Sequence, residues 1–232
     1  MRTFWLLFLF IGCVSGPFGW RVVHAEGEAA TVVQPEKVAP ENALLSSAEK
    51  GDAQAQNALA RSYEKGDGVA QDDGMAAIWF RRAAEQGLAE AQVQLGMMYR
   101  GGKGVPRNDR EAAMWLRKAA EQGVASAQSH LGFLYRSGRG VVRDDKAAVE
   151  WFRRAAEQGD STAQHNLGAL YANGEGVPQE YVQAYLWLNL AAVHGNEIAQ
   201  YNLDSLEKQM TTSQVARAQQ LAREWTEKHP GK

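Results

Sequence analysis

The sequence predicts an all-α solenoid, an α/α superhelix of tandem 36-residue helix-turn-helix repeats with helical caps at its ends. The first observation behind this prediction is a glycine that recurs every 36 residues. The second is a set of Ala-Gln pairs, leucines and tryptophans with the same period. The third is the helical spacing of apolar residues between the repeated glycines. The glycines are Gly51, Gly87, Gly123, Gly159 and Gly195, and the leucines are Leu59, Leu95, Leu131, Leu167 and Leu203.

The unit over residues 52–87 shows how each repeat forms two helices. Residues 53–65 are rich in helix formers, and Gly66 ends this stretch because glycine tolerates the left-handed cap conformation. Asp72 or Asp73 caps the second helix, since a carboxylate accepts hydrogen bonds from the unpaired backbone N–H groups of a first turn. The side chains that the second helix turns inward are Ala76, Trp79, Phe80 and Ala83.

The repeat pattern divides the chain into an ordered array with caps. A helix over residues 40–51 caps the N-terminal end, and Pro40 suits its first turn. Residues 196–232 form a partial fifth repeat and a C-terminal capping helix, for which Ser213 suits the N-cap. End units that drop repeat residues are expected of caps, because one of their sides faces solvent. The four full repeats cover residues 52–87, 88–123, 124–159 and 160–195.

The N-terminus has the composition of an export signal. Arg2 precedes an apolar run over residues 4–11, which is shorter than the ~20 residues of a membrane-spanning helix. We expect a signal peptide over residues 1–25, cleaved after Ala25. Residues 26–39 are polar, show no period and are expected to form a flexible linker. The mature protein is then periplasmic or secreted, without a transmembrane span.

An alternative interpretation of the N-terminus is a lipoprotein signal. The segment Phe10-Ile11-Gly12-Cys13 is similar to a bacterial lipobox, and lipidation at Cys13 would anchor the protein to a membrane. Cleavage after Ala25 would instead remove Cys13, the only cysteine, so that the mature chain would contain no disulfide bond. Both interpretations place the protein outside the cytoplasm.

Charge patterning disfavours nucleic-acid binding. Lysine and arginine together number 25 and aspartate and glutamate 27, so the chain has no net basic character. Basic pairs recur on the predicted second helices, and a glutamate lies four residues after the first member of each pair, within ion-pair reach. We therefore expect a self-neutralised outer face and no nucleic-acid partner. The pairs are Arg81-Arg82, Arg117-Lys118 and Arg153-Arg154, and the glutamates are Glu85, Glu121 and Glu157.

The full repeat pattern is A-x-A-Q-x-x-L-G-x-x-Y, then G-x-G-V, then A-x-x-W-x-x-x-A-A-x-x-G, and residues 89–123 show it whole. This pattern resembles the Sel-one-like repeat (SLR) family, a branch of the tetratricopeptide-like α-solenoids. The resemblance implies a right-handed superhelix that presents a concave surface to protein partners, and bacterial members are often exported. Some cysteine-rich members have one disulfide per repeat and are linked to penicillin binding, but this chain lacks those cysteines.

One short segment matches a catalytic motif. Ser47-Ala48-Glu49-Lys50 fits the S-x-x-K motif of penicillin-recognising enzymes, but the companion motifs S-D-N and K-T-G are missing from the sequence. The histidines show no metal-binding spacing. We therefore expect a protein that is not an enzyme and has no cofactor or metal. The alternative is an envelope enzyme or a cell-wall glycan (penicillin- or peptidoglycan-related) binding protein.

Positions that vary between repeats are free to recognise a partner. With Leu59 placed at 0° on the first helix, positions 57 and 61 fall at about 160° and 200°, opposite the core. A neighbouring row, which includes Gln94, carries hydrogen-bonding groups. We predict a partner-binding stripe on the concave face, formed by Val93, Met97, Phe133, His165, Tyr201, Gln94, His130 and Asn166.

Met97 and Phe133 have a second interpretation, in which they pack between neighbouring first helices as part of the core. The sequence alone leaves both interpretations open. In either case it predicts a non-catalytic protein-protein interaction scaffold or adaptor at the bacterial cell envelope. We expect a protein or peptide partner to bind on the concave face of the solenoid.

Overall fold

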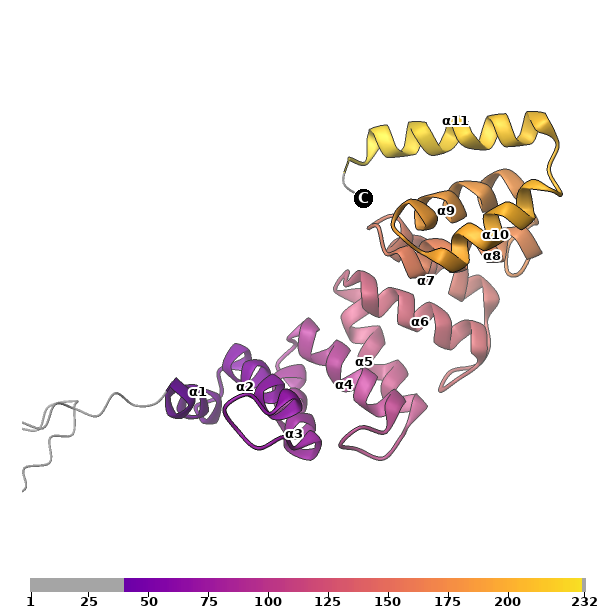
Figure 1. Cartoon of the computed structure of the whole chain (residues 1–232). Helices are drawn as coiled ribbons and strands as arrows, with labels where there is room; N and C mark the ends of the chain where they lie inside the picture. The colour runs from indigo at the N-terminus through magenta and orange to yellow at the C-terminus, as the bar shows by residue number, and fades with distance from the viewer. Residues whose placement is uncertain (1–39, 231–232) are drawn as a thin grey trace, which may run out of the picture. The chain divides into compact units, whose positions relative to one another are not determined.

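The computed structural model describes residues 40–230, and all regular structure within this range is α-helical (Figure 1). Within this range, residues 44–230 belong to one compact unit. The expected signal peptide, the linker and the alternative lipidation site at Cys13 lie outside the described residues. The helices are α1 (Pro40–Glu49), α2 (Ala53–Lys65), α3 (Asp73–Glu85), α4 (Ala89–Gly101), α5 (Asp109–Glu121), α6 (Ala125–Ser137), α7 (Asp145–Ala156), α8 (Ser161–Asn173), α9 (Tyr181–Val193), α10 (Glu197–Glu207) and α11 (Thr212–Lys228).

The helices pack against one another in chain order. Each first helix contacts the second helix of its own repeat, so α2 pairs with α3, α4 with α5, α6 with α7 and α8 with α9. Each second helix also contacts the first helix of the next repeat, as α3 does with α4. After the fourth repeat, α10 and α11 both pack on α9 (Figure 1). This stack of helix pairs confirms the predicted all-α solenoid.

Side-chain caps begin the two helices of the first repeat, and a glycine cap ends α2; the caps at Asp72 and Gly66 agree with the prediction. Asp52 Oδ1 accepts a hydrogen bond from the backbone N–H of Ala55 at 2.7 Å, at the start of α2. Asp72 Oδ1 accepts one from the backbone N–H of Met75 at 3.0 Å, at the start of α3. Gly66 follows α2 with a φ of +77°, a left-handed conformation that would strain a residue with a side chain.

The cap of α11 differs from the prediction. Thr211, not Ser213, is the N-cap, and α11 begins at Thr212. Thr211 Oγ1 accepts a hydrogen bond from the Gln214 backbone N–H at 3.3 Å, and Gln214 Oε1 accepts one from the Thr211 backbone N–H at 2.9 Å. This reciprocal capping box satisfies two backbone donors, whereas Ser213 lacks such a partner three residues further on.

Small residues on the first helices let the two helices of a repeat approach closely. A Cβ atom at Gly96 would lie 2.8 Å from Leu116 Cγ, and one at Gly132 would lie 2.9 Å from Phe152 Cδ1. A large side chain from the second helix therefore fills the space that the glycine leaves on the first helix. Leu116 and Phe152 are fully buried as a result.

The recurring Ala-Gln pairs form a buried polar ladder between repeats. Gln92 Nε2 donates to the backbone oxygen of Ala84 at 3.1 Å, and Gln92 Oε1 accepts from Gln122 Nε2 at 2.8 Å. Gln56 and Gln128 make the equivalent two hydrogen bonds. Because a buried amide needs hydrogen-bond partners, these contacts explain why glutamine recurs at an inward-facing position.

Candidate partner-binding surface

The predicted stripe lies on the first helices α2, α4, α6, α8 and α10, whose outward side we call the first-helix face. The row that begins at position 57 is buried at its start and exposed at its end. Its members are Asn57, Val93 and Ser129, which are buried, His165, which is half-buried, and Tyr201, which is 76% exposed. The row that begins at position 61 comprises Arg61, Met97 and Ala169, which are half-buried, and Phe133 and Ser205, which are exposed.

Val93 departs from the expected exposure. Only 9% of it is accessible, because it packs in one hydrophobic cluster with Ala127 and Leu131 of the next first helix. A helical wheel treats one helix in isolation and therefore misses this neighbour. Met97 packs against the same cluster, as the core interpretation has it. Phe133, in contrast, is 41% exposed, as the surface interpretation has it.

Phe133 lies between two hollows on the first-helix face, and we call the whole region the Phe133 groove. The first hollow has a volume of about 420 Å³ and receives side chains from α4, α6 and α8. The second has a volume of about 340 Å³. Phe133 is the one residue that lines both. The first is lined by Arg100, Ser129, His130, Phe133, Arg139, Phe152, Thr162 and Asn166, and the second by Phe133, Arg136, Ser137, Arg143 and Glu175.

Hydrogen bonds across repeats hold the polar side chains of the groove in place. Arg100 Nη1 donates to His130 Nδ1 at 3.5 Å, which links α4 to α6. Arg136 Nη1 donates to Asn166 Oδ1 at 3.3 Å, which links α6 to α8. The two contacts join equivalent positions in successive repeats. The walls of the groove are therefore set by the stacking of the repeats.

Burial and neighbouring charges shift the ionisation of two groups in the first hollow. Burial lowers the pKa of His130, the Arg100 guanidinium lowers it further, and Asp160 acts in the opposite direction. Burial also lowers the pKa of Arg100, as does the positive charge of Arg139, while Asp109 opposes them. In this hollow, burial therefore favours the neutral form of the His130 imidazole. The Arg100 guanidinium has a second positive charge, that of Arg139, nearby.

The structure brings together only part of the predicted stripe. Phe133, His130 and Asn166 line the first hollow, whereas Gln94 and Tyr201 line neither hollow. His165 Nε2 accepts a hydrogen bond from Asn202 Nδ2 at 2.9 Å, outside the groove. Sequence reasoning missed the arginines of the groove, although two of them recur 36 residues apart in the last turns of α4 and α6. These arginines are Arg100, Arg136, Arg139 and Arg143.

The basic pairs on the second helices do not form the predicted ion pairs. Arg117 Nη2 donates to the hydroxyl oxygen of Tyr135 in the next repeat at 2.6 Å, and Lys118 lies over the Trp115 ring at 4.2 Å. Within residues 40–230, none of the ion pairs includes the glutamates four residues after the pairs. The basic groups lie instead against aromatic rings, whose faces attract cations. The same contacts recur at Arg81, Arg82, Arg153 and Arg154.

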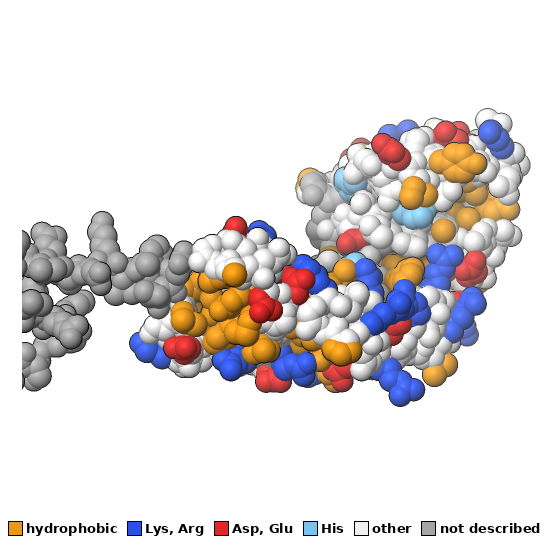
Figure 2. Space-filling view, turned by 60° about the horizontal axis from the view of Figure 1, so that its bottom comes forward, with side chains coloured by type: hydrophobic (Ala, Val, Ile, Leu, Met, Phe, Trp, Pro, Cys, Tyr) orange, Lys and Arg blue, Asp and Glu red, His pale blue; other side chains and the backbone are white. Residues whose placement is uncertain are grey.

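Hydrophobic side chains also gather over the first repeat, while acidic and basic groups intermingle elsewhere on the same side of the molecule (Figure 2). Separately, a shallow hollow of about 360 Å³ lies between α3 and the loop that follows α4. It is lined by Met75, Ile78 and Val105 among others, and Ile78 is 46% exposed. This hollow belongs to a second helix and lies apart from the first-helix face.

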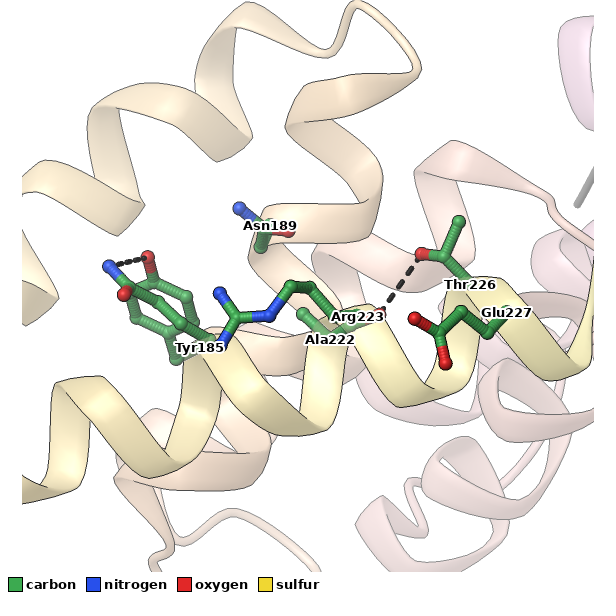
Figure 3. A pocket seen from close by; sticks show the side chains of 7 residues that line it. Tyr185, Asn189, Ala222, Arg223, Thr226 and Glu227 are labelled. Atoms are coloured by element: carbon green, nitrogen blue, oxygen red, sulfur yellow. Dashed lines mark hydrogen bonds between the residues drawn. The ribbon is translucent and has the colours of Figure 1, made fainter.

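A further hollow, of about 470 Å³, lies between α9 and α11 (Figure 3). Thr226 Oγ1 donates to the backbone oxygen of Ala222 at 3.0 Å, and Gln219 Nε2 donates to the hydroxyl oxygen of Tyr185 at 3.4 Å. Burial raises the pKa of Tyr185. These polar groups therefore serve to join α11 to α9 and to close the turns of α11.

The sequence raised two further kinds of site, a metal site and the catalytic S-x-x-K motif. In the described part of the chain, no group of three or more His, Cys, Asp or Glu side chains is placed to hold a metal ion. Ser47 is half-buried near the end of α1, and Lys50 is exposed beyond that end. Among the helices of residues 40–230, none has the length and apolar character to cross a membrane.

Comparison with known proteins agrees with this architecture. A Sel1 repeat protein from Oxalobacter formigenes is 38% identical with a TM-score of 0.65, and the match covers 69% of this chain and 66% of that one. A protective antigen present in uropathogenic Escherichia coli strains, which displays an SLR fold, is 31% identical with a TM-score of 0.53. That match covers 85% of this chain and 50% of the antigen. The chain thus spans about two thirds and one half of the lengths of these two proteins. No curated protein matches it.

The family model described as Sel1 repeat matches the chain four times in succession. The matched segments are residues 53–88, 89–124, 125–160 and 161–196. Each segment begins at or beside the first residue of a first helix and continues past the end of the second helix, so it contains one helix pair. The matches together cover more than half of the chain, which therefore belongs to the Sel1 repeat family.

Proposed function

We propose that this protein is a non-catalytic scaffold at the bacterial cell envelope that binds a protein or peptide partner on its first-helix face. Sel1 repeat proteins are generally scaffolds for protein interactions. The observation that carries the proposal is the Phe133 groove. It presents an exposed aromatic side chain between two hollows whose walls carry arginine, histidine and asparagine. In protein interfaces, a few aromatic and arginine side chains commonly contribute most of the binding free energy.

The envelope location rests on the sequence of the N-terminus. Export with cleavage after Ala25 would release a periplasmic or secreted protein, and lipidation at Cys13 would anchor it to a membrane. The intact mass of the protein recovered from the producing cell distinguishes the two forms. A mass that begins at Glu26 supports release, and a diacylglycerol-modified Cys13 supports anchoring. A mass that retains Met1 would contradict export in either form.

Partner binding is tested by capture from an envelope extract on the immobilised protein, followed by mass spectrometry. We expect a protein that is retained by the unaltered chain and lost from Phe133→Asp, because the new carboxylate removes the apolar anchor. Met97 is unsuitable for this test, since it packs against the core and its replacement would disturb folding.

Ile78→Asp is the matched control, because Ile78 is exposed to a similar extent but lies on a second helix. It should retain the partner. If Phe133→Asp captures the same proteins as the unaltered chain, the first-helix face is not the binding surface. If neither the unaltered chain nor Ile78→Asp retains any protein above the background of an empty matrix, the scaffold function itself is contradicted.

A further inference from the structure

A cross-repeat ion pair is found at two of the three junctions between full repeats along the first-helix face. It joins the last turn of a first helix to the loop that follows the first helix of the next repeat. Lys103 Nζ lies 3.2 Å from Glu64 Oε1 at one junction, and Arg136 Nη2 lies 3.2 Å from Glu175 Oε2 two junctions later. At the junction between them, the two equivalent positions are both arginine, namely Arg100 and Arg139.

The two arginines are compensated unequally. Arg139 forms a two-pronged ion pair with Asp109, with Nε–Oδ2 and Nη2–Oδ1 distances of 3.2 and 3.1 Å. Asp109 is shared with Arg107, whose Nη2 lies 3.0 Å from Oδ2. Within residues 40–230, no carboxylate lies within ion-pair distance of Arg100, and its polar contact is His130. One carboxylate is therefore missing from this junction.

Arg100 and Arg139 both line the first hollow of the Phe133 groove. Phe133 forms part of the same wall, with the fully buried Phe152 behind it, and Ser129, Thr162 and Asn166 add hydrogen-bonding groups. Arg100 is half-buried, so an anion that reached it would be partly shielded from water. Charge-assisted hydrogen bonds strengthen under such conditions.

We propose that the first hollow binds the carboxylate of an aspartate or glutamate side chain in the partner's peptide, with Arg100 as the principal ligand and Arg139 beside it. An apolar side chain of the same peptide packs on Phe133. This inference rests on the proposed scaffold function and specifies the chemistry of its partner. The ligand supplies the acid that Glu64 and Glu175 supply at the other two junctions.

Two observations favour an acidic side chain over other anions. The second hollow continues on the far side of Phe133, so a peptide chain can extend from the bound carboxylate past Phe133. Asp109, Asp160 and Glu175 lie around the groove and would repel a densely charged polyanion. A single carboxylate flanked by apolar residues fits this charge pattern, whereas nucleic acid does not.

The test uses an array of short immobilised peptides of random sequence, probed with the fluorescently labelled full-length protein. Each peptide is present with an amidated and with a free C-terminus. We expect the bound peptides to be enriched in Asp or Glu next to an apolar residue, in both terminal forms. Replacing that acid by Asn or Gln in a selected peptide should weaken binding about tenfold to a hundredfold, because one charge-assisted hydrogen bond is lost.

Arg100→Glu is the decisive variant. It places at position 100 the acid found at position 64, so it can pair with Arg139 as Glu64 pairs with Lys103. The variant should unfold at the same temperature as the unaltered protein or above it, and it should lose the preference for acidic peptides. Lys146→Gln removes one positive charge from an exposed position on a second helix and should keep the preference.

Each outcome bears on a different statement. Binding of peptides without acidic enrichment overturns the carboxylate proposal and leaves the scaffold function standing. An acidic preference that survives in Arg100→Glu also overturns it. Binding confined to peptides with a free C-terminus shows that a terminal carboxylate, not a side chain, is the ligand. Failure of the unaltered protein to bind any peptide, together with failure to capture a partner from extract, contradicts the scaffold function as well.

Discussion

His130 is the titratable member of its row, whose other residues are Gln94, Asn166 and Asn202. Burial and the guanidinium of Arg100 both disfavour the protonated ring, so the pKa of His130 lies below its ordinary value. The ring then serves as an acceptor for Arg100 and adds no positive charge to the Phe133 groove. Because His130 contributes no charge and Arg139 is paired with Asp109, Arg100 is the principal arginine of the first hollow without an ion-pair partner among residues 40–230.

We expect His130 to make the folded chain less stable as pH falls. Above the ordinary histidine pKa of about 6.5, the ring is neutral in both folded and unfolded chains and has no effect. As pH drops through that value, the unfolded chain takes up a proton that folded His130 resists, so protonation favours unfolding. His130→Gln should therefore flatten the decrease in urea midpoint between neutral and mildly acidic pH.

Asn166→Gln provides the control for this measurement. It alters the same hollow without adding or removing a titrating group, so its pH dependence should match that of the unaltered chain. His165 retains part of the slope in both variants, because burial and Arg136 lower its pKa as well. An equally steep decrease in His130→Gln would show that the histidine does not resist protonation in the folded state.

At the scale of the helix pair, the buried glutamine of each full repeat's first helix joins three elements. Gln92, on α4, bonds to the end of α3 through Ala84 and to the end of α5 through Gln122. Gln122 Nε2 also donates to the backbone oxygen of Gly87 at 3.1 Å. The ladder therefore fixes how one repeat sits on the next, and the groove depends on that placement.

Gln92→Leu should lower the free energy of unfolding by about 1–3 kcal/mol, because two buried hydrogen bonds disappear while the apolar volume is roughly kept. Urea denaturation followed by circular dichroism measures the change. Gln54→Leu, at an exposed position of α2, should leave the midpoint nearly unchanged. A loss as small as that of the control would mean that the ladder contributes nothing to the junction.

The ends of the first helices could be predicted from the sequence, because a glycine in the left-handed conformation follows α2, α4, α6 and α8. Asp52, Asp72 and Gly66 act as their residue types suggest. The sequence argument failed where a second side chain decides the outcome. Gln214 moves the cap of α11 to Thr211, and aromatic rings attract the basic pairs away from the glutamates.

The candidate site was predictable in part for the same reason. Comparison of equivalent positions identified Phe133, His130 and Asn166, which line the first hollow. The burial of Val93 depends on the spacing between neighbouring first helices, which one helix cannot reveal. The sequence did not indicate that Arg100 and Arg139 belong to one site, because they lie 39 positions apart and come together only across a junction between repeats.

Across the whole array, the two ends differ from the inner repeats. An inner repeat buries both of its sides against neighbours, whereas an end repeat has one side without a neighbour and needs a cap. At the C-terminal end, α11 covers α9, whose residues are apolar on nearly all sides. Ala218 and Ala222 of α11 are buried there, and the Trp225 ring meets the Trp187 ring edge-on at 5.9 Å. This helix replaces the repeat that would otherwise follow.

Removal of residues 211–232 should therefore expose the apolar surface of α9, including Trp187. Because each repeat contacts mainly its neighbours, we expect faster amide hydrogen exchange in α8, α9 and α10, with an effect that fades toward α2. Sedimentation should show self-association of the truncated chain, since a large exposed apolar patch favours contact with a second copy. A chain truncated after Pro230 keeps α11 together with His229, which stacks on Trp225, and should behave as the full protein does. Equal loosening of α2 and α9 would show that the array unfolds as one cooperative unit and that the cap acts on the whole of it.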